Sequence, residues 1–182
     1  MNRRGYIDWL RGTCVLIMIE AHTLDAWTRL SERHSPIYGW AMILGGFAAP
    51  AFLFLAGLSL ALAAGSRLRR GRTTGEVTNL AIRRSLQIFG LAFLFRLQSW
   101  LMSGGGPGQT LLKVDILNIM GLSMLAAAVL WGLGRGRWDR AAWLIAATVG
   151  IAMVTPIVRA TPLLAPLPDP IEWYIRPIPG RG

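Results

Sequence analysis

Long apolar stretches separated by short arginine-bearing segments dominate the chain. Five of them, at about residues 8–28, 38–64, 86–102, 114–133 and 141–158, approach the ~20 residues that an α-helix needs to cross a bilayer core. The pattern therefore predicts an all-α, polytopic transmembrane helical bundle with about five spans. The second stretch is long and contains Pro50, so we expect a tilt or a kink there.

Arginines cluster at the amino end, between the second and third stretches, and between the fourth and fifth. If five spans alternate, all three clusters lie on one side of the membrane. The positive-inside rule makes that side cytoplasmic, so we expect a cytoplasmic amino terminus. The residues are Arg3, Arg4, Arg11, Arg67, Arg69, Arg70, Arg72, Arg83, Arg84, Arg135, Arg137 and Arg140.

The composition is that of an integral membrane protein. Hydrophobic residues make up 53% of the 182 positions and charged residues only 15%, against about 25% charged residues in soluble domains. The net charge of +10 resides mainly in the loops, so we expect the lipid bilayer, and not nucleic acid, as a partner. One cysteine and two histidines give no basis for a disulfide framework or a metal site. The proline-rich residues 159–182 predict an irregular extra-cytoplasmic tail.

The first stretch contains a histidine, His22, between Glu20 and Asp25. Ionisable groups at membrane depth are costly and usually serve a function, and histidine exchanges protons most readily near neutral pH. Helical geometry places Arg11 within ~20° of His22, with Asp8 and Asp25 on the same broad face and Glu20 ~160° away. Asp25, three residues after His22, is expected to orient the imidazole. The alternative is a structural histidine that hydrogen-bonds a neighbouring helix.

Further polar residues occur in the third and fourth stretches. Arg96 and Gln98 lie in the outer part of the third. For Arg96 we weigh binding of an anionic group, pairing with Asp25 or Glu20, and snorkelling to the interface. The fourth stretch opens with Lys113, Asp115 and Asn118. Asp115 has a favourable interaction with the helix dipole, and an asparagine in such a stretch typically bonds a neighbouring helix.

The run Tyr6-Ile7-Asp8-Trp9-Leu10-Arg11-Gly12, followed by Met18 and His22, resembles the opening of the heparan-alpha-glucosaminide N-acetyltransferase-like family of polytopic membrane acyltransferases. Segments 49–57, 89–98 and 113–121 resemble its later signatures. The resemblance implies transfer of an acyl group, usually acetyl, from cytoplasmic acetyl-CoA or another acyl-CoA. The acceptor it implies is a sugar amine or hydroxyl across the membrane.

The same resemblance implies roles for individual residues. His22 matches the histidine of the family and would act as general base on the acceptor or carry the acyl group transiently. Asp8 and Arg11 would organise the cytoplasmic half, where the donor enters. The remaining supporting or substrate-binding candidates are Asp25, Arg96, Gln98, Asp115 and Asn118.

Members of the family usually have more spans than five. We therefore expect residues 1–182 to form one integral-membrane domain, the N-terminal part of a larger acyltransferase domain in the bacterial inner membrane. A C-terminal half or a second copy of the chain would complete it. The alternative is a non-catalytic membrane protein, such as a transporter half or a truncated assembly subunit, whose intramembrane charges line a path or join helices.

Overall fold

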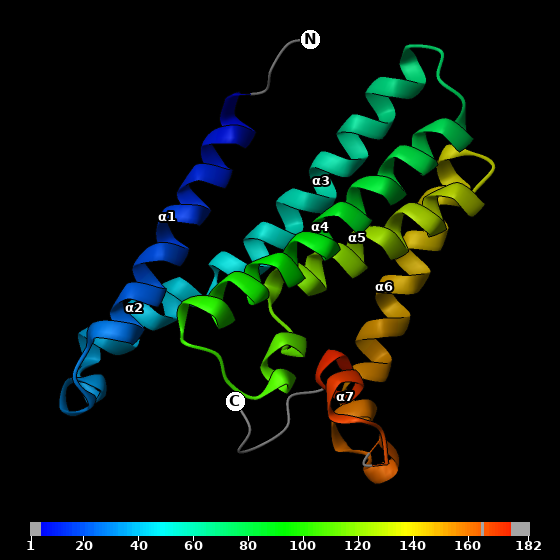
Figure 1. Ribbon diagram of the computed structural model, residues 1–182. Coiled ribbons are helices and arrows are strands. Elements are labelled where there is room, and N and C mark those ends of the chain that lie inside the picture. Colours follow the sequence, from blue (N-terminus) through cyan, green and yellow to red (C-terminus); the bar gives the residue numbers. More distant parts are fainter. Residues whose placement is uncertain (1–4, 165, 176–182) are drawn as a thin grey trace. The chain divides into compact units, whose positions relative to one another are not determined.

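A computed structural model describes residues 5–164 and 166–175, and every regular element in that part of the chain is a helix (Figure 1). The prediction of an all-α fold is confirmed. Arg3, Arg4 and the end of the predicted tail, residues 176–182, lie outside the described residues. The elements are α1 (Gly5–Trp27), η1 (Leu30–His34), α2 (Pro36–Gly46), α3 (Ala48–Arg69), α4 (Thr74–Met102), η2 (Gly108–Leu112), α5 (Ile116–Leu133), α6 (Arg137–Ala160), η3 (Pro162–Leu164) and α7 (Asp169–Ile175).

Three segments of the described chain are long and apolar enough to cross a membrane: Pro36–Arg69, Ile116–Leu133 and Arg137–Ala160. The five spans expected from the sequence are therefore an overcount. Helices α1 and α4 have sufficient length, 23 and 29 residues. However, charged and amide side chains, among them the candidate site residues Arg11 and Asp25 in α1 and Arg96 and Gln98 in α4, reduce their apolar character.

The second predicted stretch is interrupted, but not at Pro50. Helix α2 ends at Gly46 and α3 begins at Ala48, with Phe47 between them. Pro50 lies in the first turn of α3, where a backbone N–H has no partner within the helix in any case, so proline is tolerated. The interruption falls instead directly after the Gly45-Gly46 pair, a recognised place for helix kinks.

The chain forms two compact units, one up to Leu62 and the other from Ala63. In the first unit, α1 packs on α3 through Ile7, Cys14 and Leu55, all of which are buried. Close to the other end of α1, a Cβ added at Gly45 would clash with the Cβ of Ala21, so glycine allows α2 to approach α1 closely. Flanking apolar contacts come from Ala51, Phe52, Leu58 and Leu62.

In the second unit, α4 and α5 pack along a seam of small side chains. On α5 these include Gly121 and Ala128, both buried. A Cβ added at Gly121 would lie 2.8 Å from the Cβ of Phe89 and 2.9 Å from its Cα. Such close approach is how membrane helices gain packing energy without a hydrophobic driving force. The buried residues of α4 on this seam are Val77, Ala81, Ser85 and Ala92.

Helix α4 begins twelve residues before the predicted start at 86. Its amino end is a capping box, in which Thr73 Oγ1 accepts from Glu76 N at 3.3 Å and Glu76 Oε2 accepts from Thr73 N at 3.1 Å. These two bonds satisfy the backbone N–H groups of Thr73 and Glu76, which would otherwise have no partner at the start of the helix. The first turns of α4 are polar, so apolar patterning alone does not find them.

The tail is more regular than predicted. We expected no regular helix after residue 161, yet α7 spans Asp169–Ile175. Pro170 lies at its second residue, within the first turn, where proline neither removes a helical hydrogen bond nor clashes with a preceding carbonyl. The expectation was wrong because it treated every proline of the tail as an interior one.

Candidate active site

The amino-terminal polar group of the first unit consists of Asp8, Arg11 and Ser59. Arg11 Nη1 lies 3.8 Å from Asp8 Oδ1, one helical turn away, as expected from the spacing. Arg11 Nη2 also donates to Ser59 Oγ of α3, and Ser59 Oγ donates to the carbonyl of Leu55 at 2.6 Å. Arg11 therefore joins α1 to α3, and Ser59 is a partner that sequence reasoning missed.

His22 lies on α1 beside the packed face and not on it. Residues Ile7, Cys14 and Ala21, spaced by seven, face α2 and α3, and His22 is offset from Ala21 by ~100°. The His22 side chain is exposed, and no described side chain hydrogen-bonds or ion-pairs with it. Within the described residues, the alternative of a histidine held in place by a neighbouring helix gains no support.

Asp25 does not contact His22 in the structure, contrary to the orienting role that the spacing predicted. Its carboxylate instead lies 3.3 Å from Arg33 Nη1 and accepts a 3.2 Å bond from the Tyr38 hydroxyl. Arg33 also donates to the Asp25 carbonyl through Nη2. The turn η1 folds Arg33 back onto the end of α1, and a sequence pattern does not foresee this reversal.

The second unit holds the remaining candidates at the end of the α4–α5 seam. Arg96 Nε lies 3.3 Å from Asp115 Oδ2, so Arg96 pairs with Asp115, a partner that the sequence analysis did not propose for it. Asp115 is the N-cap of α5, and its Oδ1 accepts from Leu117 N at 3.1 Å and Asn118 N at 3.3 Å. One carboxylate thus starts α5 and holds the guanidinium of α4.

Asn118 connects this pair to the tail. It is 1% exposed, its Oδ1 accepts from Asp115 N at 3.2 Å, and its side chain hydrogen-bonds the hydroxyl of Tyr174 in α7. The Tyr174 ring also lies 6.5 Å from that of Phe89. Tyr174 is therefore a second residue that the sequence analysis missed. Tyrosine is enriched at membrane interfaces, and this preference could have indicated that the tail packs against the helix ends.

Gln98 stays apart from this cluster. Its side chain is exposed, and its Nε2 lies 3.9 Å from Met102 Sδ on the same helix. Successive residues of a helix point about 100° apart, so Gln98 faces some 200° away from Arg96. Arg96, Asp115 and Asn118 are thus brought together, whereas Gln98 is not.

Alkaline pH is expected to release α7. Burial raises the pKa of the Tyr174 phenol, the Asp115 carboxylate adds to the rise, and the Asn118 hydrogen bond offsets part of it. Because the pKa is higher when α7 is docked, the stabilisation is complete below the ordinary value of about 10 and is lost as the pH rises through the docked-state value. The difference in tyrosinate absorbance between the native protein and Tyr174→Phe is expected to have a midpoint above about 10.

A Tyr174 midpoint at or below the ordinary value would contradict the docked arrangement.

Comparison of the sequence with known proteins identifies a family. Neither curated proteins nor solved structures give a match. The family model described as heparan-alpha-glucosaminide N-acetyltransferase, catalytic, matches residues 3–169. That range includes Asp8, Arg11, Ser59, Arg96, Asp115 and Asn118. The chain is an integral membrane protein with helices apolar enough to span a bilayer, and it belongs to the heparan-alpha-glucosaminide N-acetyltransferase family of membrane acyltransferases.

Proposed function

We propose that the protein moves an acyl group, acetyl in the first instance, from cytoplasmic acyl-CoA to a sugar amine or hydroxyl on the opposite side of the membrane. The family match over residues 3–169 carries this proposal. The localisation we propose is the bacterial inner membrane, with the amino terminus in the cytoplasm. The positive-inside rule favours this orientation, because the arginine-rich turns between α3 and α4 and between α5 and α6 meet at one end of the second unit.

His22 is our candidate for the catalytic residue. Its imidazole is exposed on α1 and forms no hydrogen bond with the described side chains, so it is free to exchange a proton. As general base it takes the proton of the acceptor hydroxyl or amine while the acceptor attacks the thioester carbonyl, and the CoA thiolate leaves. As acyl carrier it would itself attack the thioester and then pass the acyl group to the acceptor.

The other candidates divide by their exposure. Arg96 and Asp115 are partly exposed, with 28% and 29% of their side-chain surfaces accessible, so we assign them polar contacts to the acceptor. Asn118 is 1% exposed and supports Asp115 and Tyr174 without touching a ligand. Arg11, joined to Asp8 and Ser59, is proposed to order the end of α1 where the donor enters. The positions of Asp25 and Gln98 do not favour contact with the donor or the acceptor.

The proposal is tested with sealed membrane vesicles from cells that produce the chain and from cells that lack it. Acyl-labelled acetyl-CoA is supplied to the cytoplasmic face, and label is measured on sugar amines and hydroxyls at the other face. We expect labelled product only where the chain is present. Equal labelling in both vesicle preparations, or label confined to the cytoplasmic face, would overturn it.

A further inference from the structure

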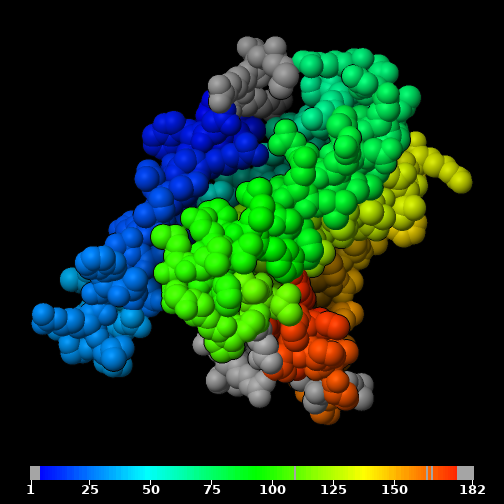
Figure 2. Space-filling model, viewed as in Figure 1, coloured from blue at the N-terminus to red at the C-terminus, as the bar shows by residue number. Residues whose placement is uncertain are grey.

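Two arginine-rich turns of the second unit meet at one end of its helices (Figure 1 and Figure 2). The turn between α3 and α4 lies beside the turn between α5 and α6, because Arg140 Nη2 donates to Thr74 Oγ1 at 2.9 Å. Arg140 Nε also donates to the carbonyl of Gly134 at 3.1 Å, and its guanidinium lies 5.0 Å above the Trp131 ring. Together the two turns and the helix ends beside them carry six arginines, called the arginine cluster below: Arg69, Arg70, Arg72, Arg135, Arg137 and Arg140.

Acidic side chains at these turns pair with only part of the cluster. Glu76 completes the capping box of α4 and lies 3.5 Å from Arg72. Asp139 accepts the backbone N–H of Arg135 at 2.8 Å. Arg69, Arg70 and Arg137 are exposed, and no described carboxylate forms an ion pair with them. Their guanidinium groups remain available to an external anion.

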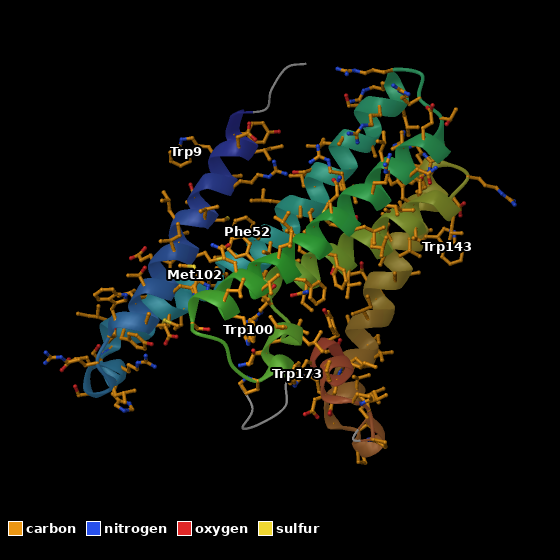
Figure 3. All side chains as sticks on the ribbon, viewed as in Figure 1. Trp9, Phe52, Trp100, Met102, Trp143 and Trp173 are labelled. Carbon is orange, nitrogen blue, oxygen red and sulfur yellow. The ribbon has the colours of Figure 1, made fainter. Side chains whose placement is uncertain are left out.

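The cluster adjoins an apolar surface suited to acyl chains. The guanidinium of Arg137 lies 4.7 Å from the Trp138 ring, and Trp138 is 75% exposed. Further along α6, Trp143 points away from the helix (Figure 3). Tryptophan is enriched where a helix passes from headgroups to hydrocarbon, and α6 is among the segments apolar enough to cross a membrane.

We propose that the arginine cluster binds the headgroup of an anionic phospholipid, with the lipid phosphate at Arg69, Arg70 and Arg137 and the acyl chains along α6. The guanidinium fork matches phosphate oxygens, and basic clusters at the ends of membrane helices attract anionic lipids. The positive-inside rule explains why these arginines lie on one side of the membrane. It does not explain why Arg140 hydrogen-bonds Thr74 and so holds the two turns side by side.

The test uses the purified full chain in uncharged micelles titrated with phosphatidylglycerol or phosphatidylcholine, with bound lipid counted by native mass spectrometry. We expect phosphatidylglycerol to bind in preference, and its affinity to fall as salt is added. Each arginine in such a cluster contributes roughly 5-fold to affinity. The double variant Arg69→Gln/Arg137→Gln should therefore bind phosphatidylglycerol about 25-fold more weakly.

The matched control is Arg29→Gln/Arg159→Gln, which removes the same charge from exposed arginines outside the cluster. Arg159 lies in the last turn of α6, the same helix that begins with Arg137. Helical circular dichroism of both variants checks that they fold. Equal weakening by the two variants, equal binding of phosphatidylcholine, or displacement of the lipid by an equal concentration of inorganic phosphate would overturn the proposal. None of these outcomes depends on acyl transfer.

Discussion

Replacing His22 with alanine is expected to lower acyl transfer by about 10²–10⁴-fold, the usual contribution of a positioned general base. The amount of protein in the membrane should stay the same. The imidazole is exposed and forms no hydrogen bond with the described residues, so its removal breaks no hydrogen bond among them. The measurement is transfer of label from acetyl-CoA in vesicles that contain equal amounts of each protein.

The matched control is His34→Ala, which removes the other histidine of the chain from the exposed turn η1. It should retain full activity. Full activity of the His22 variant would sink the catalytic assignment. Incubation with labelled donor and no acceptor separates the two mechanisms, because only an acyl carrier leaves label on the native protein that the His22 variant lacks.

Replacing Gly121 with alanine is expected to destabilise the second unit by about 1–3 kcal/mol, the usual cost of overpacking. The new methyl group would meet Phe89 Cβ at 2.8 Å and the backbone N and Cα of Phe89 at 2.9 Å. A side chain can rotate away from such a contact, but backbone atoms move only if α4 and α5 separate. The measurement is the free energy of unfolding in detergent micelles.

Gly150→Ala is the control for this substitution. Gly150 lies in α6, and a Cβ added there would meet nothing within 4 Å. Alanine is favoured over glycine in a helix interior by up to ~1 kcal/mol, so this variant should be unchanged or more stable. If Gly121→Ala proves as stable as Gly150→Ala, the close α4–α5 approach at Phe89 is wrong.

The helical fold was predictable because apolar stretches of bilayer length permit few alternatives. The polar ends of the helices were not predictable from the apolar pattern, and α4 is an example. Its capping box at Thr73 and Glu76 was present in the sequence, but the apolar pattern begins only at residue 86. The number of spans was overestimated for a related reason. The prediction relied on the length of each apolar stretch and gave too little weight to the charged residues of α1 and α4.

The candidate site was predictable where its partners lie on one helix. The Asp8–Arg11 pair followed from a spacing of three, and the structure contains it. Partners from other elements were missed, since spacing says nothing about how a turn reverses direction. For this reason the ion pair between Arg33 and Asp25 was not predicted. The hydrogen bond between Tyr174 and Asn118 was missed as well, because the tail was predicted to be irregular.

The polar character of α1 has a consequence for biogenesis. Arginine or aspartate at the centre of a helix costs roughly 2.5–3.5 kcal/mol on insertion, whereas each large aliphatic residue returns only about 0.3–0.6 kcal/mol. The more apolar segment Pro36–Arg69 inserts readily, and its Ser59 offers Arg11 a hydrogen-bond partner. Helix α1 is synthesised first, and we therefore expect it to enter the bilayer stably only after α3 has inserted and supplied Ser59.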